Sequence, residues 1–383
     1  MRWISARRCR SLCAGLGLLP ACTPDPTPDP PGWPRGEPMT LTLDGQPLVE
    51  GQFDGGPTLL WALDTGADGM YLDRDLAPGV LNPEGELRLG ATELGELTLR
   101  ALDLREAEAF LGVDLGGLAG QPFFAERVVT LDYAAARLIV GDALPEGTPA
   151  AARGTVATLP VDLDLGIPVV ELDLGIGEPV AFIADTGSGV TMITESQFAA
   201  LNDDSLPRLH GYVWATNRGR DDAFVTRLPT LRADGENIDG SWAIVVPDDH
   251  HLADLLRLAG LPSQFLGFPF YRRGALAVDG PAEEFTFWPY AAGADPDEWR
   301  RVGVELTWRE GSAVVEMLFS PSDAEDAGVL VGDRVLEIDG VIPGSLDAAR
   351  LLLRGTGERL LRLSRGEDEL SLTVSAQDLL PLL

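Results

Sequence analysis

The chain has 383 residues, which suggests two or three domains at roughly 150 residues each. It carries 60 acidic and 29 basic residues, a formal net charge of −31 that argues against nucleic acid or an anionic membrane as a partner. Every basic residue is arginine and the three cysteines (Cys9, Cys13 and Cys22) lie near the N-terminus, which excludes lysine-dependent sites and a disulfide or cysteine-rich zinc framework in the body of the chain.

The first 37 residues have the pattern of a targeting segment. Four arginines and no acid precede an apolar stretch at 12–19, which has the length of a signal peptide and is too short to span a membrane. This stretch ends in Leu19-Pro20-Ala21-Cys22, which resembles a bacterial lipobox and so implies cleavage before Cys22 and lipidation of that residue. We therefore expect residues 1–21 to be a lipoprotein signal peptide and residues 22–37 to be a proline-rich tether.

The expected location follows from this anchor. The mature chain would contact the membrane only through its lipid, in the bacterial cell envelope, on the outer membrane or facing the periplasm. An ordinary secretory signal, and hence a secreted protein, is the alternative.

From residue 38 onward the pattern indicates β structure. The expected strands are short, apolar and bounded by glycine, proline, aspartate or asparagine. They fall at 40–43, 58–63, 87–89, 96–99, 128–131, 138–140, 169–174, 180–184, 212–215, 242–246, 275–278 and 285–288. Helical periodicity is scarce, and residues 251–259 give the clearest short case.

The body of the chain contains an internal repeat. Residues 48–72 align without gaps on 169–193, and a later block at 120–124 matches 267–271. We therefore expect two related β lobes, at 38–145 and 155–292, each long enough to bury a core.

Each expected lobe contains an apolar strand followed directly by Asp-Thr-Gly. The two copies are Asp64-Thr65-Gly66-Ala67 and Asp185-Thr186-Gly187-Ser188, and they stand in register inside the repeat. One such tetrapeptide is a weak signal, but two in register are specific. The pattern resembles the aspartic protease superfamily, in particular the bacterial retropepsin-like aspartyl proteases, with their later hydrophobic-hydrophobic-Gly block at 118–120 and 265–267. This resemblance implies a two-lobed, pseudo-twofold acid-protease β-barrel fold over residues 38–290.

Paired carboxyl groups suit peptide hydrolysis because the reaction needs both a base and an acid. An ionised carboxylate can take a proton from water, and a protonated one can donate to the carbonyl oxygen. Two carboxylates held about 3 Å apart cannot both ionise easily, so the pair retains one proton. We therefore expect Asp64 and Asp185 to be the catalytic dyad of an aspartic endopeptidase that acts on proteins or peptides without a metal or organic cofactor.

The remaining loop residues are expected to support this dyad. By resemblance, Thr65 and Thr186 hydrogen-bond across the lobes, and Gly66 and Gly187 let the backbone turn tightly behind each carboxylate. The last loop residue is Ala67 in lobe one and Ser188 in lobe two.

That difference between the loops carries an expectation about charge. A serine hydroxyl can donate to the adjacent carboxylate and so lower its pKa, which alanine cannot do. We therefore expect Asp185 to carry more of the negative charge and Asp64 to hold more of the shared proton.

Two hairpins are candidates for a mobile cover over the dyad. They are residues 86–99 in lobe one and 212–227 in lobe two, and a glycine at a hairpin tip suits such a role. An ordinary surface hairpin is the alternative for each.

After a linker at 291–297 the pattern changes. Residues 320–340 contain Ser-Pro-Ser, Ala-Gly-Val and Gly-Asp-Arg-Val-Leu-Glu-Ile-Asp-Gly, and they resemble the central block of bacterial PDZ domains. The resemblance covers 299–376 and implies a small α+β PDZ domain, with a helix at 346–354 and a loop of Val302, Gly303 and Val304 that binds a peptide terminus. Such a domain would bind a peptide ligand or regulate access, and a spacer without a ligand is the alternative.

Two other functions stay open. The chain could be a non-catalytic peptide-binding lipoprotein on an aspartic protease fold, or its lobes could serve only as a scaffold for the PDZ domain. Intact Asp-Thr-Gly in both lobes favours the peptidase, because one substituted aspartate would inactivate the pair. The pair His250-His251 is expected to lie in a solvated loop rather than at a metal.

Overall fold

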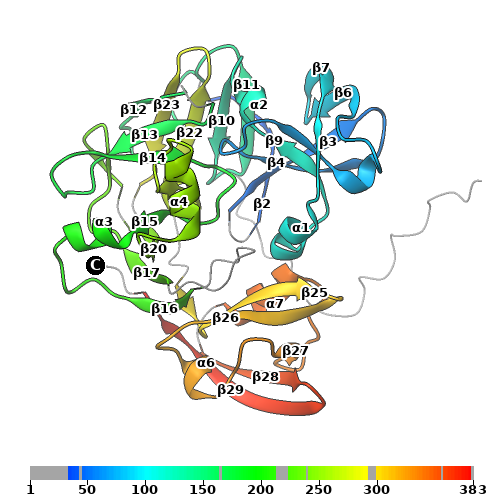
Figure 1. Cartoon of the computed structure of the whole chain (residues 1–383), viewed down its shortest axis with the longest axis vertical. Helices are drawn as coiled ribbons and strands as arrows, with labels where there is room; N and C mark the ends of the chain where they lie inside the picture. Colours follow the sequence, from blue (N-terminus) through cyan, green and yellow to red (C-terminus); the bar gives the residue numbers. More distant parts are fainter. Residues whose placement is uncertain are drawn as a thin grey trace, which may run out of the picture.

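The protein is built mostly of β-strands, in two lobes followed by a separate C-terminal sheet (Figure 1). The computed structural model describes residues 33–42, 45–163, 166–212, 223–238, 240–291, 299–354 and 357–380. The two-lobed, mainly β architecture expected from the repeat is confirmed. The expected signal peptide and Cys22 lie outside the described residues. Within the described ranges, no helix is long and apolar enough to cross a membrane.

Lobe one is an eight-stranded sheet with short helices. Strands β7, β6, β3, β4, β9, β5 and β8 are neighbours in this order, and β2 pairs with β3. Their bounds are Thr40–Leu41 (β2), Pro47–Phe53 (β3), Thr58–Leu63 (β4), Met70–Asp73 (β5), Glu84–Leu89 (β6), Thr92–Thr98 (β7), Arg100–Leu102 (β8) and Leu115–Ala119 (β9). The helices are η1 (Arg74–Leu76), α1 (Arg105–Leu111) and α2 (Gln121–Phe124).

Lobe two repeats this plan in a seven-stranded sheet. The order is β13, β14, β21, β15, β20, β17 and β16. The bounds are Val169–Leu172 (β13), Val180–Ala184 (β14), Met192–Thr194 (β15), Leu209–Tyr212 (β16), Ala223–Arg227 (β17), Trp242–Val246 (β20) and Phe265–Leu266 (β21). A small hairpin, β18 (Arg232–Ala233) with β19 (Glu236–Asn237), and the helices α3 (Glu195–Ala200), α4 (His251–Leu258) and α5 (Phe268–Tyr271) complete the lobe.

The repeat in the sequence is a repeat in the pairing of strands. In lobe one, β4 runs parallel to β9, which runs antiparallel to β5, which in turn runs parallel to β8. In lobe two, β14, β21, β15 and β20 pair in the same senses and the same order. The Asp-Thr-Gly loops therefore follow equivalent strands.

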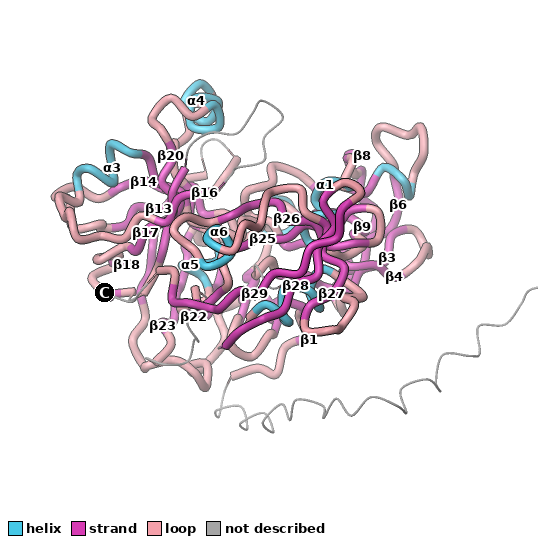
Figure 2. The backbone as a smooth tube through the Cα atoms, turned by 90° about the horizontal axis from the view of Figure 1, so that it is seen from below, coloured by secondary structure: helices cyan, strands magenta, loops and turns pink. Residues whose placement is uncertain are grey.

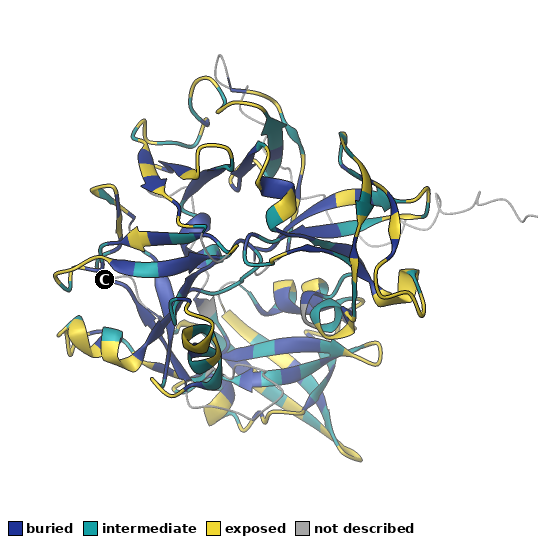
Figure 3. Ribbon diagram, turned by 45° about the horizontal axis from the view of Figure 1, so that its top comes forward, coloured by how far each residue is buried: buried dark blue, intermediate teal, exposed yellow. Residues whose placement is uncertain are grey.

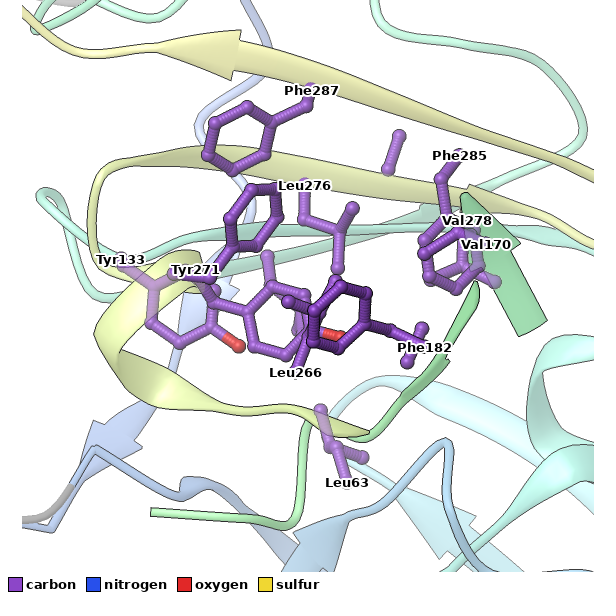
Figure 4. Packing of buried hydrophobic residues seen from close by; sticks show 14 of the residues in the cluster. Leu63, Tyr133, Val170, Phe182, Leu266, Tyr271, Leu276, Val278, Phe285 and Phe287 are labelled. Carbon is purple, nitrogen blue, oxygen red and sulfur yellow. The ribbon is translucent and has the colours of Figure 1, made fainter. Parts of the chain in front are cut away.

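A six-stranded sheet joins the lobes. Its order is β1 (Glu37–Pro38), β11 (Arg137–Gly141), β10 (Val128–Asp132), β22 (Gly274–Asp279), β23 (Glu284–Pro289) and β12 (Ala157–Pro160). The lobes meet where β10 pairs antiparallel with β22, with Thr130 opposite Ala277. This shared sheet is one layer of the largest buried apolar cluster, whose residues come from both lobes (Figure 4).

Residues 299–380, here called the C-terminal unit, form a six-stranded sheet with two helices. The strand order is β24 (Arg300–Arg301), β29 (Asp368–Asp378), β28 (Gly357–Arg365), β27 (Arg334–Ile338), β26 (Ser312–Leu318) and β25 (Val304–Arg309). The helices are α6 (Asp323–Asp326) and α7 (Leu346–Leu353), and α7 starts where the Ser345 hydroxyl accepts a hydrogen bond from Ala348 N at 3.1 Å.

The C-terminal unit lies across both lobes. Viewed from below, its strands occupy the middle of the molecule, between the strands of lobe one and those of lobe two (Figure 2). The burial of side chains follows the layers, with buried strands inside and exposed residues on turns and outer helix faces (Figure 3). In the view of Figure 1, the six-stranded sheet that joins the two lobes lies at the top of the molecule, and the C-terminal unit lies at the bottom.

Candidate active site

Matching strands place the two aspartates. Strand β4 ends directly before Asp64 and β14 directly before Asp185. Asp64 N donates to Ala119 O at 2.9 Å, and Asp185 N donates to Leu266 O at 3.0 Å. Each aspartate is therefore held by the strand that runs parallel to its own, and the two loops meet between the lobes.

The two threonines bind the loops to each other. Thr65 N donates to Thr186 Oγ1 at 3.0 Å, and Thr186 N donates to Thr65 Oγ1 at 2.9 Å. Each hydroxyl also donates into the opposite lobe, Thr65 to Ala184 O at 2.6 Å and Thr186 to Leu63 O at 2.8 Å. Both threonines are buried, so these bonds exclude water and each lobe completes the loop of the other.

The two glycines allow the carboxyl groups to approach. A Cβ built on Gly66 would lie 2.7 Å from Asp185 Cγ, and one on Gly187 would collide with the Asp64 carboxyl group. Neither glycine has a positive φ, so glycine is needed here for space rather than for its backbone freedom. Each carboxyl group thus lies over the glycine of the opposite lobe.

The carboxyl groups are held by backbone amides and share a proton. Gly66 N donates to Asp64 Oδ1 at 2.9 Å, and Gly187 N donates to Asp185 Oδ1 at 2.9 Å. Burial raises the pKa of both carboxyl groups, and the negative charge of Asp64 raises the pKa of Asp185 further. The pair therefore keeps one proton, and which of the two carboxyl groups holds more of it stays a prediction.

Ser188 does not make the contact expected of it. Its hydroxyl donates to Val190 O at 2.8 Å and accepts from Val190 N at 3.3 Å. Asp185 is contacted instead by the backbone N–H of Ser188, as Asp64 is by that of Ala67. The expectation that the Ser188 hydroxyl bonds to Asp185, and so distinguishes the two carboxyl groups, is wrong, because this hydroxyl bonds to the backbone oxygen of Val190 instead.

A second turn lies beneath each loop. Gln121 N donates to Ala67 O at 2.8 Å, and Phe268 N donates to Ser188 O at 2.9 Å. A Cβ on Gly120 or Gly267, just before these residues, would collide with the loop above. This explains why the hydrophobic-hydrophobic-Gly block recurs in both lobes, since only glycine leaves room for the Asp-Thr-Gly loop.

Gln121 adds a contact that the sequence analysis missed. Its Nε2 donates to Thr65 O at 2.6 Å, whereas the equivalent residue of lobe two, Phe268, has no side-chain donor. The signal that could have identified it is its place directly after the repeated glycine.

Two buried tyrosines lie near Asp185. The rings of Tyr133 and Tyr271 stack with their centroids 6.3 Å apart and an interplanar angle of 10° (Figure 4). Burial raises the pKa of both hydroxyls, and the negative charge of Asp185 adds to the effect. Both tyrosines therefore stay neutral, so they pack beside the dyad without adding a charge to it.

Of the two hairpins considered as covers, the one formed by β6 and β7 has its turn fixed by hydrogen bonds to other parts of the chain. The turn between β6 and β7 is fixed by Ala91 N, which donates to the Glu37 carboxylate at 2.6 Å, and by Gly90 N, which donates to Glu50 O at 2.7 Å. The tip of the other hairpin, residues 213–222, lies outside the described residues. Which hairpin covers the dyad stays a prediction.

The other predicted residues lie elsewhere. Val302, Gly303 and Val304 lead into β25 of the C-terminal unit, and the carbonyls of Val302 and Gly303 accept bonds from Ala324 N at 3.1 Å and Phe319 N at 2.8 Å. The role of this loop in binding a peptide stays a prediction. The expectation that His250-His251 lies in a solvated loop is wrong for His250, which is buried at the start of α4, where its Nδ1 accepts a bond from Leu252 N at 3.3 Å. No group of three or more His, Cys, Asp or Glu side chains that could hold a metal occurs within the described part of the chain.

Comparison with known proteins gives little beyond this geometry. No family model matches the chain, and no curated protein matches it. Among solved structures, the aspartic proteinase from Irpex lacteus matches 68% of this chain and 99% of its own, at 14% sequence identity and a TM-score of 0.44. An overlap of this quality does not by itself establish a common fold.

Proposed function

We propose that the chain is an aspartic endopeptidase whose catalytic residues are Asp64 and Asp185. The observation that supports it best is the pair of half-buried carboxyl groups, both with raised pKa, on loops that exchange threonine hydrogen bonds. A purely structural pair of acids would gain nothing from this arrangement, because burial opposes the ionisation of both. Strongly perturbed, convergent carboxyl groups are what general acid–base chemistry requires.

The chemistry follows from one shared proton. The ionised carboxylate takes a proton from water as the water oxygen attacks the peptide carbonyl carbon. The protonated carboxyl group gives its proton to the carbonyl oxygen, which forms a tetrahedral diol. When this diol collapses, the carboxyl group that took the proton from water gives it to the peptide nitrogen, and a diol hydroxyl gives its proton to the other carboxylate. The C–N bond breaks, the carbonyl of the new acid forms, and the pair is again singly protonated. The substrate is a protein or peptide, and no step calls on a metal or organic cofactor.

The C-terminal unit would bind a peptide ligand. Its strand β25 is the last in its sheet and follows the loop of Val302, Gly303 and Val304, while α7 packs against it. A strand at the edge of a sheet can accept an extended peptide as a further strand. This arrangement supports a PDZ-like role, either in substrate capture or in regulation.

The membrane anchor belongs to the same proposal. Lipidation of Cys22 would hold the mature chain at the cell envelope through residues 22–37. Cys22→Ser should move the protein from the membrane fraction to the soluble fraction, or leave the precursor uncleaved. A wild-type chain that is fully soluble after removal of its signal peptide would contradict the anchor.

Substitution of each aspartate tests the peptidase. Asp64→Asn and Asp185→Asn keep the shape of the side chain but cannot share a proton, so each should abolish cleavage of a mixed peptide library. Because the two groups act as a unit, the double variant should lose no more activity than either single one. Asp279→Asn, at a hydrogen-bonded turn of lobe two, is the matched control and should cleave normally.

The outcomes separate the candidate functions. Cleavage that survives in either single variant would contradict the dyad. A wild-type chain that binds the library but never cleaves it would support the non-catalytic peptide-binding alternative.

A further inference from the structure

The C-terminal unit is fixed to lobe two through an apolar contact. Trp299, Phe319 and Leu380 are all buried in a cluster that otherwise consists of lobe-two residues. The ring of Trp299 meets that of Trp242, on β20, edge-on with centroids 5.0 Å apart. Burial of three large side chains between two units makes them one body.

Polar contacts reinforce this body. His210 N donates to Ser320 O and Ser320 N donates to His210 O, both at 2.9 Å, so β16 is bonded to the chain that follows β26. The buried guanidinium group of Arg227 donates from Nε and Nη2 to Leu380 O at 3.0 and 2.6 Å. Lobe two and the C-terminal unit thus share backbone hydrogen bonds as well as a core.

The contact with lobe one is of a different kind and is made by α1. Thr307 Oγ1, on β25, donates to Ala109 O at 3.3 Å. At the end of α1, Gly112 has a φ of 74°, and a Cβ built on it would lie 2.8 Å from Leu346 Cβ at the start of α7. Figure 1 shows α1 next to β25 and α7. Among the described residues, no buried apolar cluster spans α1 and the C-terminal unit, whereas one joins that unit to lobe two, so we take the α1 junction as the weaker of the two.

Helix α1 lies in the space beside β25 that an extended peptide bound to this strand would need. In the sheet of the C-terminal unit, β25 has β26 on one side and no further strand on the other. Thr307 stands in the second half of β25, and Leu346 begins the helix that packs against this strand. Helix α1 thus contacts Thr307 on one side and Leu346 on the other, so it lies at the end of the space between β25 and α7, where an extended peptide added along β25 would meet it.

We propose that α1 is a releasable latch, and that α1 and an extended peptide exclude each other from β25. Release of the latch frees lobe one from the body formed by lobe two and the C-terminal unit. This inference rests on the proposed peptidase function, because Asp64 belongs to lobe one and Asp185 to lobe two. The six-stranded sheet joins the lobes at one end of the molecule, and the latch joins lobe one to the C-terminal unit at the other end (Figure 1). The latched form would be the less active one, because the latch holds lobe one, which carries Asp64, in one position relative to the body that carries Asp185.

A wedge in the latch is the first test. Thr307→Arg places a long cation beneath α1 and removes the bond to Ala109, whereas Glu367→Arg makes the same kind of change at the exposed turn before β29. We expect Thr307→Arg to raise kcat/KM on an unfolded protein substrate roughly tenfold, as release of a mostly closed population would. Glu367→Arg should match the wild type. Equal values for all three proteins would overturn the latch.

A reducible cross-link is the second test, and it covers the case in which Thr307→Arg misfolds. The natural cysteines are Cys9, Cys13 and Cys22, so Ala109→Cys with Thr307→Cys can be joined selectively in a background where all three are replaced by serine. The cross-linked protein should cleave more slowly than the wild type, and reduction should restore its rate. A cross-link without effect on the rate would contradict the proposal.

Hydrogen exchange separates failure of the latch from failure of the peptidase. A pool of random nonapeptides with free C-termini should speed exchange of the α1 amides in the full-length Asp64→Asn protein, which cannot digest the pool. Faster exchange without cleavage by any variant would keep the latch and refute the peptidase. Cleavage by the wild type with unchanged α1 exchange would refute competition at β25 and keep the peptidase.

Discussion

In lobe one the aspartate loop ends in Ala67 and rests on Gln121, whereas in lobe two it ends in Ser188 and rests on Phe268. The hydrogen bonds to the two carboxyl groups nevertheless come from equivalent backbone positions. The side chains that differ point to backbone acceptors or to the core instead. The comparison teaches that the environment of the dyad is made by the backbone and the threonines, which leaves the flanking side chains free to vary.

The threonine exchange gives the largest expected effect and the strictest test of this symmetry. Thr65→Val and Thr186→Val each remove a hydroxyl that donates to one buried backbone carbonyl and accepts from one buried N–H. Two buried groups lose their partners, so each variant should lower the free energy of unfolding by about 2–4 kcal/mol, measured by urea denaturation. Serine at the same position keeps the hydroxyl and should restore most of the loss.

The two valine variants should also agree with each other to within about 0.5 kcal/mol, because their hydrogen bonds are reciprocal. A larger difference between the two losses of stability would show that one lobe depends on the exchanged threonine hydrogen bonds more than the other.

The shared proton makes stability depend on pH. Because burial raises the pKa of both aspartates in the folded chain, the folded state holds a proton that the unfolded chain releases near pH 4. The pair's contribution to stability is therefore complete below that pH and is lost as the pH rises through the raised pKa. Each pKa unit of difference is worth about 1.4 kcal/mol.

Asparagine should abolish that loss. Asp185→Asn keeps an acceptor for Gly187 N but has no proton to release, so the variant should be more stable than the wild type at pH 8 and similar to it at pH 3. Urea denaturation across this range is the measurement. A wild-type stability that rose with pH relative to the variant would show that the pair is not held partly protonated.

Local pattern was enough to predict the elements that carry the aspartates. Residues 58–63 and 180–184 were expected as strands and are β4 and β14, because both are apolar runs that end at a polar turn. The sequence pattern does not identify the short strand β5, because its apolar run is only three residues, Met70 to Leu72. The repeat was the stronger guide, because it predicts which loops correspond as well as where strands lie.

What the sequence could not predict depends on contacts between distant residues. The acceptor of the Ser188 hydroxyl depends on which oxygen the folded loop places nearest to it. The hydrogen bond from Gln121 to Thr65 joins residues that are 56 positions apart in the sequence. The seat of α1 on β25 joins residues 198 apart, in elements that no shared motif connects. Side-chain chemistry alone does not rank such alternatives, so these contacts appear only with the fold.

Gln121 should matter to one lobe only. Gln121→Met removes the bond to Thr65 O and keeps most of the side-chain volume, which should cost about 1 kcal/mol of stability. Hydrogen exchange at the Gly66 amide should quicken, while exchange at the Gly187 amide should not change. Phe268→Met is the matched control in lobe two and should leave the Gly66 amide unaffected. Equal quickening at both glycines would mean that Gln121 supports the two loops jointly.

The smallest effect is expected where the sequences of the loops differ most visibly. Ser188 Oγ is engaged with Val190 O, and the equivalent acceptor in lobe one, Gly69 O, receives a bond from Gly120 N at 3.1 Å. A serine placed at position 67 can take up the same local bond, so its hydroxyl would also turn away from the carboxyl group. The alkaline limb of kcat/KM against pH reports loss of the shared proton. Ser188→Ala and Ala67→Ser should therefore each move this limb by less than about 0.3 pH unit, equivalent to roughly 0.4 kcal/mol. A shift of a full pH unit in Ser188→Ala would mean that the Ser188 hydroxyl does interact with the Asp185 carboxyl group. The surroundings of the two carboxyl groups would then differ by a side-chain contact.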